Sequence, residues 1–223
     1  MKNVFEDEWI LLLNELFEFG EDVEKDDARI KEVIGVHEQI KNPYSNSIIN
    51  ISADKFAYYV KEGIFDIAEY PIKGEALFDY ITSLDDEHQI YLDDDGFIYT
   101  YSERLQNYND INQLDVIINR LNKNINSNRA IAVTYNPMVD MNRQDIPCLQ
   151  LIQALVRNDK LILSVYFRSN DLYGAFPSNM MFLTYLGMKI ADELGVQFDY
   201  IDYHCSSLHI YETDYEQASK VIM

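Results

Sequence analysis

The sequence predicts an α+β fold in a single domain that spans residues 1–223. A chain of 223 residues is long enough to bury a continuous core. Its 48% hydrophobic and 13% aromatic content argues against disorder. Two periodicities occur along it: residues 5–19 repeat apolar side chains at helical spacing, whereas residues 32–41 alternate as a strand does. Helices and strands are therefore both expected.

The first half of the chain is predicted to contain short helices and strands. Trp9, the single tryptophan, lies on the apolar face of residues 5–19 and is expected to anchor the core, and Gly20 ends this helix. A charged loop that contains Arg29 follows. Apolar periodicity and alternation then predict the remaining elements: helices at 52–63, 74–83 and 111–122, and strands at 32–41, within 93–105 (with tyrosines at 99 and 101) and at 130–135.

The second half is organised around residues 145–179. An apolar strand follows Cys148, and after a turn a second strand ends in Arg168 and Ser169. A helix at 179–194, which mixes Met, Leu and Tyr, is predicted to belong to the core and to close at Gly195. The last clear strand contains residues 203–211.

Composition excludes several classes of function. A net charge of −20 works against binding of nucleic acid, which requires a basic surface. The 18 basic residues still allow a local site for a small phosphorylated ligand. No apolar run is long enough to span a membrane, and the acidic start has no secretory core, which predicts a cytoplasmic protein. Two cysteines and four histidines without ligand spacing predict neither a disulfide framework nor a metal site.

The chemistry of the 145–179 stretch is that of a nucleophile beside an anion site. Cys148 follows a proline, and the Arg168 guanidinium is expected on the neighbouring strand, where its charge would favour the thiolate. Ser169, Asp171 and Asn179 add a hydroxyl, a carboxylate and a carboxamide. A lone cysteine is more often a small buried hydrophobe. Its fixed spacing to four other motif residues favours a functional thiol, whereas Cys205 is expected to be structural.

These motifs resemble those of thymidylate synthases. That family carries a nucleophilic cysteine in Pro-Cys, an Arg-Ser-x-Asp twenty residues later, then a Pro-x-Asn and a His-x-Tyr. Here the last two are matched by Pro177 to Asn179 and by His209 to Tyr211, without a gap. The details PCLQ, FRSND and HIY are most similar to the short archaeal branch, which grades into the pyrimidine nucleotide hydroxymethylases.

The resemblance implies a large, twisted, mixed β-sheet with flanking helices and a homodimer packed back to back, sheet to sheet. It also implies transfer of a one-carbon unit from 5,10-methylene-tetrahydrofolate or methylene-tetrahydromethanopterin to C5 of dUMP, through a covalent adduct between Cys148 and C6. No metal is implied. The matching positions are Cys148, Tyr101 and Asp171 as catalytic residues, Arg29, Arg168, Ser169 and Arg129 of the partner subunit at the phosphate, Asn179 at the uracil edge, and His209 and Tyr211 at the sugar.

Some positions depart from the family pattern. Phe56 falls where these enzymes usually carry a catalytic glutamate, and Glu62 and Glu69 are both nearby substitutes. Asn128 replaces one of two consecutive arginines, and only 12 residues follow Tyr211. Asparagine at position 179 favours deoxyuridylate, because relatives that act on cytidylate carry aspartate there. Two alternatives stay open: a pyrimidine nucleotide hydroxymethylase on the same scaffold, and a nucleotide-binding protein without turnover.

Overall fold

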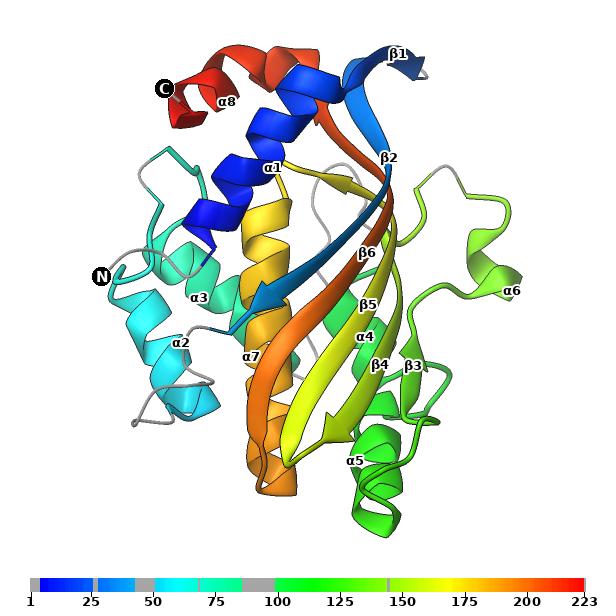
Figure 1. Ribbon diagram of the computed structural model, residues 1–223. Helices are drawn as coiled ribbons and strands as arrows, with labels where there is room; N and C mark the ends of the chain where they lie inside the picture. Colours follow the sequence, from blue (N-terminus) through cyan, green and yellow to red (C-terminus); the bar gives the residue numbers. More distant parts are fainter. Residues whose placement is uncertain are drawn as a thin grey trace.

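The fold is built on one six-stranded mixed sheet, shown in Figure 1 as a computed structural model. The structure describes residues 5–25, 28–42, 51–67, 69–85, 99–143 and 145–222. The strand order is β1-β2-β6-β5-β4-β3; β5 and β6 run parallel, and the other neighbours are antiparallel. The predicted α+β class and mixed sheet are confirmed. The strands are β1 (Glu21–Lys25), β2 (Ala28–Lys41), β3 (Ile131–Val133), β4 (Leu149–Arg157), β5 (Lys160–Asp171) and β6 (Gln197–Tyr211).

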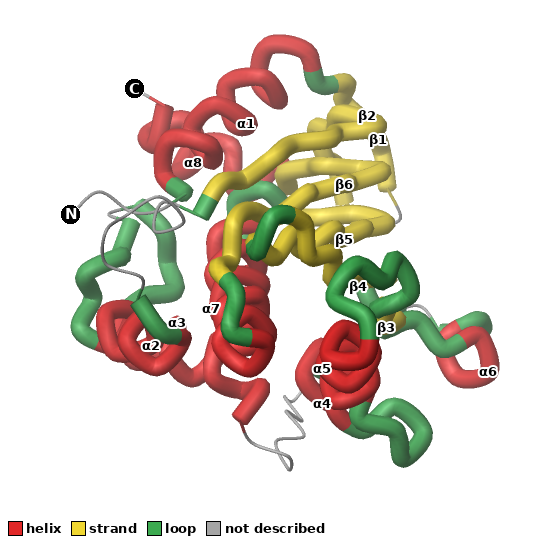
Figure 2. The backbone as a smooth tube through the Cα atoms, turned by 60° about the horizontal axis from the view of Figure 1, so that its bottom comes forward, coloured by secondary structure: helices red, strands yellow, loops and turns green. Residues whose placement is uncertain are grey.

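Helix α7 is the centre of the helical layer, and α1, α2 and α3 lie on the same side of the sheet (Figures 1 and 2). Pro177 in its first turn and Gly195, with φ of 66°, set its two ends. Within the described ranges, no helix is both long and apolar enough to cross a membrane. The helices are α1 (Glu6–Phe19), α2 (Ala53–Lys61), α3 (Gly74–Thr82), α4 (Tyr101–Gln106), α5 (Gln113–Lys123), α6 (Pro137–Asp140), α7 (Phe176–Leu194) and α8 (Tyr215–Ile222), with single 3₁₀ turns η1 (Ser83–Asp85) and η2 (Glu212–Asp214).

The β4–β5 hairpin brings the two halves of the cysteine–arginine motif together. Its turn residues, Asn158 and Asp159, have φ of 52° and 58°, which is the left-handed backbone of a tight two-residue hairpin turn. Along β5, alternate apolar residues such as Leu163 and Val165 are buried, and Tyr166 faces the other side of the sheet, 43% exposed. The tight turn fixes the register, so the far ends of the two strands lie side by side.

Trp9 has the role that its position on the apolar face predicts. Its side chain is fully buried, and its ring stacks with Tyr173 and meets Tyr70 edge-on, with ring centroids 5.9 Å apart in both cases. The indole N–H donates to the Leu172 carbonyl at 2.6 Å. Helix α1 therefore holds the connection from β5 to α7, which carries part of the candidate site.

Two predicted elements are wrong. The charged segment after Gly20 is not a loop: it forms β1 and the start of β2, so Arg29 lies on a strand. The strand expected within 93–105 is not present at Tyr101, which begins helix α4 with Thr100 as its cap. Residues 93–98 of that prediction lie outside the described residues. In both places, hydrogen bonding across the fold overrides a local pattern.

A buried ion pair joins α4 to α6. Arg104 donates to both oxygens of Asp140, at 2.8 and 3.2 Å, and to the Thr134 carbonyl at 3.3 Å. Asp140 also accepts from the backbone of Asn136 at 2.7 Å, and its side chain is fully buried. Arg104, which follows the predicted tyrosine position, therefore has a structural role.

Replacing Asp140 with alanine is expected to lower the free energy of unfolding by about 3–5 kcal/mol, because it leaves the Arg104 charge buried without its carboxylate. Denaturant unfolding followed by circular dichroism measures this change. Lys220→Ala is the matched control: it breaks the exposed pair with Glu216 and is expected to change stability by less than about 0.5 kcal/mol. A loss below about 1 kcal/mol for Asp140→Ala would contradict the assigned role.

Candidate active site

Cys148 lies immediately before β4, at an irregularity in the strand pairing. The register between β4 and β5 shifts between Leu149 and Leu151, so Gln150 is the extra residue of a β-bulge. Bulges reorient neighbouring side chains and are frequent beside active sites. The Cys148 side chain is half-buried, and its Sγ lies 3.6 Å from the Ser169 hydroxyl oxygen. The thiol is thus accessible and has a polar neighbour.

Arg168 holds the segment that carries Cys148. Its guanidinium donates to the carbonyls of Ile146 at 2.7 Å and Pro147 at 3.1 Å, and to the Ser169 hydroxyl at 3.0 Å. The Arg168 backbone N–H donates to the Cys148 carbonyl at 2.8 Å. The structure therefore brings Cys148, Arg168 and Ser169 together, as the sequence predicts. A guanidinium has five N–H donors, so it retains capacity for an anion.

Three tyrosines form a wall beside the thiol. The Tyr101 hydroxyl accepts from the Leu149 N–H at 3.2 Å, and the Tyr101 ring packs near those of Tyr99 and Phe182. Burial raises the pKa of Tyr80, Tyr99 and Tyr101 well above the usual value, and the negative charge of a Cys148 thiolate raises each of them further. The hydroxyls therefore stay protonated at neutral pH and can donate hydrogen bonds.

Asn179, in the first turns of α7, belongs to a buried chain of hydrogen bonds. Its Oδ1 accepts from the Tyr80 hydroxyl at 2.7 Å, and its Nδ2 donates to Asn170 Oδ1 at 3.1 Å. Asn170 Nδ2 in turn donates to the Tyr203 hydroxyl at 3.0 Å. The chain joins α3, α7, β5 and β6, and it fixes the carboxamide of Asn179 from two sides.

Asp171 lies at the end of β5, where the chain turns into α7. Its Oδ1 accepts from the backbone N–H groups of Tyr173 at 3.1 Å and Gly174 at 3.0 Å. A Cβ at Gly174 would lie 2.5 Å from Asp171 Oδ2, so the glycine allows this close approach. Burial raises the pKa of Asp171, and the two N–H groups and the charge of Lys25 oppose that shift.

His209 and Tyr211 lie near the end of β6, beside Asp171. His209 pairs with Asp171 in the parallel β5–β6 register, and its ring meets that of Tyr211 edge-on at 5.3 Å. Its Nδ1 lies 3.4 Å from the Ser207 carbonyl, whereas its Nε2 is buried and has no hydrogen-bond partner. An orphaned buried nitrogen of this kind costs free energy unless a ligand supplies its partner.

The three arginines that are expected to bind the phosphate lie in different parts of the structure. Arg168 is close to the thiol, whereas Arg29 lies on β2 within 3.3 Å of Asp22 and 3.4 Å of Glu212, which partly neutralise it. Arg129 precedes β3 and is exposed. Neither arginine has a contact with Cys148 among the described residues of this one chain.

No glutamate replaces Phe56 among the described contacts of Cys148. Phe56 is fully buried in α2 and its ring lies 5.5 Å from that of Phe65, so it is a core residue. Glu62 is the exposed cap of α2, and Glu69 is exposed with only its backbone carbonyl bonded, to the Tyr173 hydroxyl. The polar side chains that lie near the thiol include the Ser169 and Tyr101 hydroxyls and the Arg168 guanidinium.

Four polar residues of this region were not identified from the sequence. Lys25 lies with its Nζ 5.7 Å from the centre of the Tyr211 ring, and its charge lowers the pKa of both His209 and Asp171. Tyr80, Asn170 and Tyr203 form the chain that holds Asn179. Asn170 is inside the FRSND motif and could have been found there, but nothing local distinguishes the two tyrosines from packing residues.

A group of side chains with metal-ligating chemistry lies elsewhere, on the face of the sheet opposite α7. Within the part of the chain that the structure describes, potential ligand atoms of His37, Asp202 and His204 lie within 4.8 Å of one another. Both imidazoles bond the carboxylate, at 2.9 and 3.1 Å, and their rings stack at 4.2 Å. The two imidazoles and the carboxylate therefore already provide one another with hydrogen-bond partners. Strand register, not sequence spacing, brings them together.

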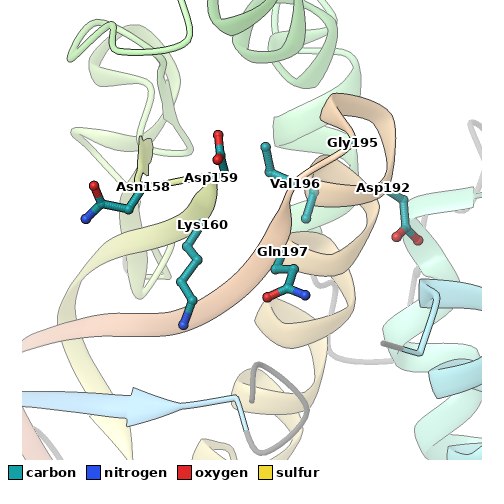
Figure 3. Close-up of a pocket in the computed structure, with 8 residues that line it drawn as sticks. Asn158, Asp159, Lys160, Asp192, Gly195, Val196 and Gln197 are labelled. Atoms are coloured by element: carbon teal, nitrogen blue, oxygen red, sulfur yellow. The ribbon is translucent and has the colours of Figure 1, made fainter. Parts of the chain in front are cut away.

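A cavity of about 520 Å³ lies between the β4–β5 turn and the carboxyl end of α7, with polar residues such as Lys160, Asp192 and Gln197 in its lining (Figure 3). The nine residues of β4 separate this turn from Cys148, a distance of roughly 30 Å at 3.3 Å per residue. This cavity is therefore not part of the thiol site.

The pKa of His209 gives a pH dependence that can be measured. Burial is the largest cause that lowers this pKa, and Lys25 and Arg168 also lower it, whereas the Ser207 carbonyl and Glu32 oppose them. Below the usual histidine pKa of about 6.5, His209 is protonated in the unfolded chain but stays neutral in the folded chain until its lowered pKa is reached. The contribution of His209 to the free energy of unfolding is therefore fully present above about pH 6.5 and is lost as the pH falls below that value.

We expect His209→Gln to remove part of the decline in the free energy of unfolding between about pH 6.5 and 5, where one histidine contributes at most about 1.4 kcal/mol per pH unit. Denaturant titrations of both proteins at several pH values measure the two slopes. Equal slopes would contradict a buried neutral imidazole at position 209.

Comparisons with known proteins agree with the fold. Residues 61–223 match the family model described as thymidylate synthase. A "Putative thymidylate synthase" of Methanothermobacter marburgensis is 32% identical over 96% of this chain and 93% of its own length, and one of Methanocaldococcus jannaschii is 40% identical over 68% and 71%. The thermostable thymidylate synthase A of Bacillus subtilis superimposes with a TM-score of 0.69 at 20% identity, over all of this chain and 84% of that one.

Proposed function

Because this chain belongs to the thymidylate synthase family, we propose that it transfers a one-carbon unit from a methylene-tetrahydropterin to C5 of dUMP and so forms dTMP. The observation that carries the proposal is the half-buried Cys148 thiol beside Ser169, on a segment that Arg168 holds. Relatives that are named "Putative thymidylate synthase" align with nearly the whole of this chain, which supports the same activity here.

The first step would be addition of the Cys148 thiolate to C6 of the uracil ring. This addition moves an electron pair toward C5 and O4, so C5 becomes a nucleophile. Arg168 is linked to the thiol through the Ser169 hydroxyl, so its positive charge would lie close to the attacking sulfur. The Tyr101 hydroxyl, which accepts from the Leu149 N–H, would donate a hydrogen bond near the anionic ring without itself losing its proton.

In the next steps C5 would form a bond to the methylene carbon of the co-substrate and lose its hydrogen as a proton. Cleavage of the bond from the methylene carbon to the pterin leaves an exocyclic methylene. Hydride from the tetrahydropterin then reduces this carbon to a methyl group, and the C6–S bond breaks to return the thiolate. The pterin leaves oxidised to its dihydro form, so atoms and electrons balance.

The remaining residues would bind the two substrates. Asn179 would hold the N3 and O4 edge of uracil, and Asp171 would contact the pyrimidine through its backbone and the pterin through its carboxylate. The orphaned Nε2 of His209, with Tyr211 beside it, supports a bond to the sugar 3′-hydroxyl. A phosphate would meet Ser169 and Arg168 through charge-assisted hydrogen bonds.

A dimer would complete the phosphate site. Arg129 is exposed in the single chain, where it is free of the core and able to cross to another subunit. The face of the sheet opposite α7 carries partly exposed apolar side chains such as Ile34 and Tyr166, at 69% and 43%. Packing of this face against a second copy is the expected arrangement. Arg29 of the same chain and Arg129 of the partner subunit would then add positive charge at the phosphate.

One observation favours the alternative of hydroxymethylation on the same scaffold. Phe56 is a core residue and both Glu62 and Glu69 are exposed, so neither candidate glutamate is placed at the thiol among the described residues. Water would then attack the exocyclic methylene, and the product would carry a hydroxymethyl group. The two products differ only in whether hydride or water reaches that carbon.

The experiment uses dUMP tritiated at C5, with each methylene-tetrahydropterin carrier in turn. The expected result is release of tritium to water with a product heavier by one methyl group, and loss of at least about 10³-fold in rate for Cys148→Ala. Cys205→Ala is the matched control and is expected to keep most of the activity, because that thiol is buried.

Release with a hydroxymethyl product would move the assignment to the alternative enzyme. Binding of dUMP without release, unchanged by Cys148→Ala, would leave a nucleotide-binding protein and contradict the proposal.

A further inference from the structure

The hydrogen-bond chain around Asn179 fixes which atoms its carboxamide can offer to a ligand. Oδ1 accepts from the Tyr80 hydroxyl, and Nδ2 donates to Asn170. A carboxamide has two acceptor positions and two N–H groups. One of each is therefore used inside the protein, and one of each is left for a bound ring.

The donors and acceptors of this hydrogen-bond chain have a fixed order. Asn170 donates to the Tyr203 oxygen at 3.0 Å, so the Tyr203 proton must point elsewhere. Burial raises the pKa of the neighbouring Cys205 thiol to about 11, and a hydrogen bond from the Tyr203 side chain opposes that shift. A Tyr203 proton directed at the Cys205 sulfur leaves the Tyr203 oxygen free to accept, as the rest of the chain requires.

Turning the Asn179 carboxamide over would require the whole chain to reverse. Asn170 would also have to turn, the Tyr80 hydroxyl would have to accept instead of donate, and the Tyr203 hydroxyl would have to donate to Asn170 instead of accept from it. Asn170 and Tyr203 are 1% and 0% exposed, so no solvent is at hand to replace a bond lost midway. A buried polar group left without a partner costs about 1–3 kcal/mol.

The two pyrimidines differ at the edge that this carboxamide would meet. Uracil offers an N–H at position 3 and a carbonyl at position 4, which match the free lone pair of Oδ1 and the free N–H of Nδ2. Cytosine offers an acceptor at position 3 and an amino group at position 4, which match only the turned carboxamide.

We propose that Tyr80, Asn170 and Tyr203 are positioning residues that hold Asn179 in the orientation complementary to uracil, and so set the preference for deoxyuridylate over deoxycytidylate. The proposal rests on the proposed function, because it takes Asn179 as the group that meets the pyrimidine. It adds that the choice of base depends on three residues that need not touch the ligand.

The test compares dissociation constants of dUMP and dCMP, measured by isothermal titration calorimetry, for the wild type and for Tyr80→Phe. We expect the preference for dUMP to fall roughly tenfold in Tyr80→Phe, which is the equivalent of one hydrogen bond. Tyr203→Phe should shift the preference in the same direction. It serves as a second variant should Tyr80→Phe fail to fold, which thermal melting checks.

Tyr70→Phe is the matched control. Its hydroxyl donates to Ser178 Oγ at 2.8 Å, next to Asn179 on the same helix, but it is outside the chain. A general loss of packing or stability would affect Tyr70→Phe in the same way as Tyr80→Phe and Tyr203→Phe. The proposal instead expects the ratio of the dissociation constants of dUMP and dCMP to change in Tyr80→Phe and Tyr203→Phe and to stay unchanged in Tyr70→Phe.

An unchanged ratio in Tyr80→Phe and Tyr203→Phe, with a wild type that prefers dUMP, would overturn this inference and leave the proposed function standing. A wild type that prefers dUMP with a shifted ratio in the variants, but releases no C5 tritium, would uphold the inference and overturn the reaction. Binding of neither nucleotide by the wild type would overturn both.

Discussion

The hydrogen bonds from Arg168 to the chain before Cys148 are the constraint on which the site depends. A single guanidinium bonds two consecutive carbonyls and the Ser169 hydroxyl, so it fixes a segment that has left the regular ladder at a bulge. The tight β4–β5 turn sets the register that makes these bonds possible. Without them the Ile146 and Pro147 carbonyls would lose the side-chain hydrogen bonds that fix the segment before the thiol.

The parallel pairing of β5 and β6 extends this arrangement to the substrate-binding residues. Because the two strands run the same way, their carboxyl ends meet at one edge, which places Asp171 opposite His209. Helix α7 starts a few residues after β5 and brings Asn179 back to the same edge. The helix in turn is held by Trp9, whose bond to Leu172 fixes the connection. Core packing and site geometry thus share the same elements.

The sequence predicted the parts of this site that are close together along the chain. Cys148, Arg168 and Ser169 were identified by their spacing, and a hairpin keeps that spacing in space. The resemblance places Arg29 in a charged loop between a helix and a strand, whereas β1 pairs with the start of β2 there and Arg29 lies on a strand. Tyr101 was assigned to a strand because tyrosines favour strands, but the Thr100 side chain caps a helix there. The partnership of Tyr80 with Asn179 spans 99 residues, and no local pattern reveals a contact of that range.

The most direct test of the account is whether Cys148 forms a covalent bond to the pyrimidine. A dUMP analogue with fluorine at C5 suits this test, since fluorine cannot leave as the C5 proton does and the adduct should accumulate. Intact-protein mass spectrometry, with methylene-tetrahydropterin present, is expected to show a gain equal to nucleotide plus pterin, located on the peptide that contains Cys148. Absence of such a gain with either carrier, or its location on Cys205, would contradict the account.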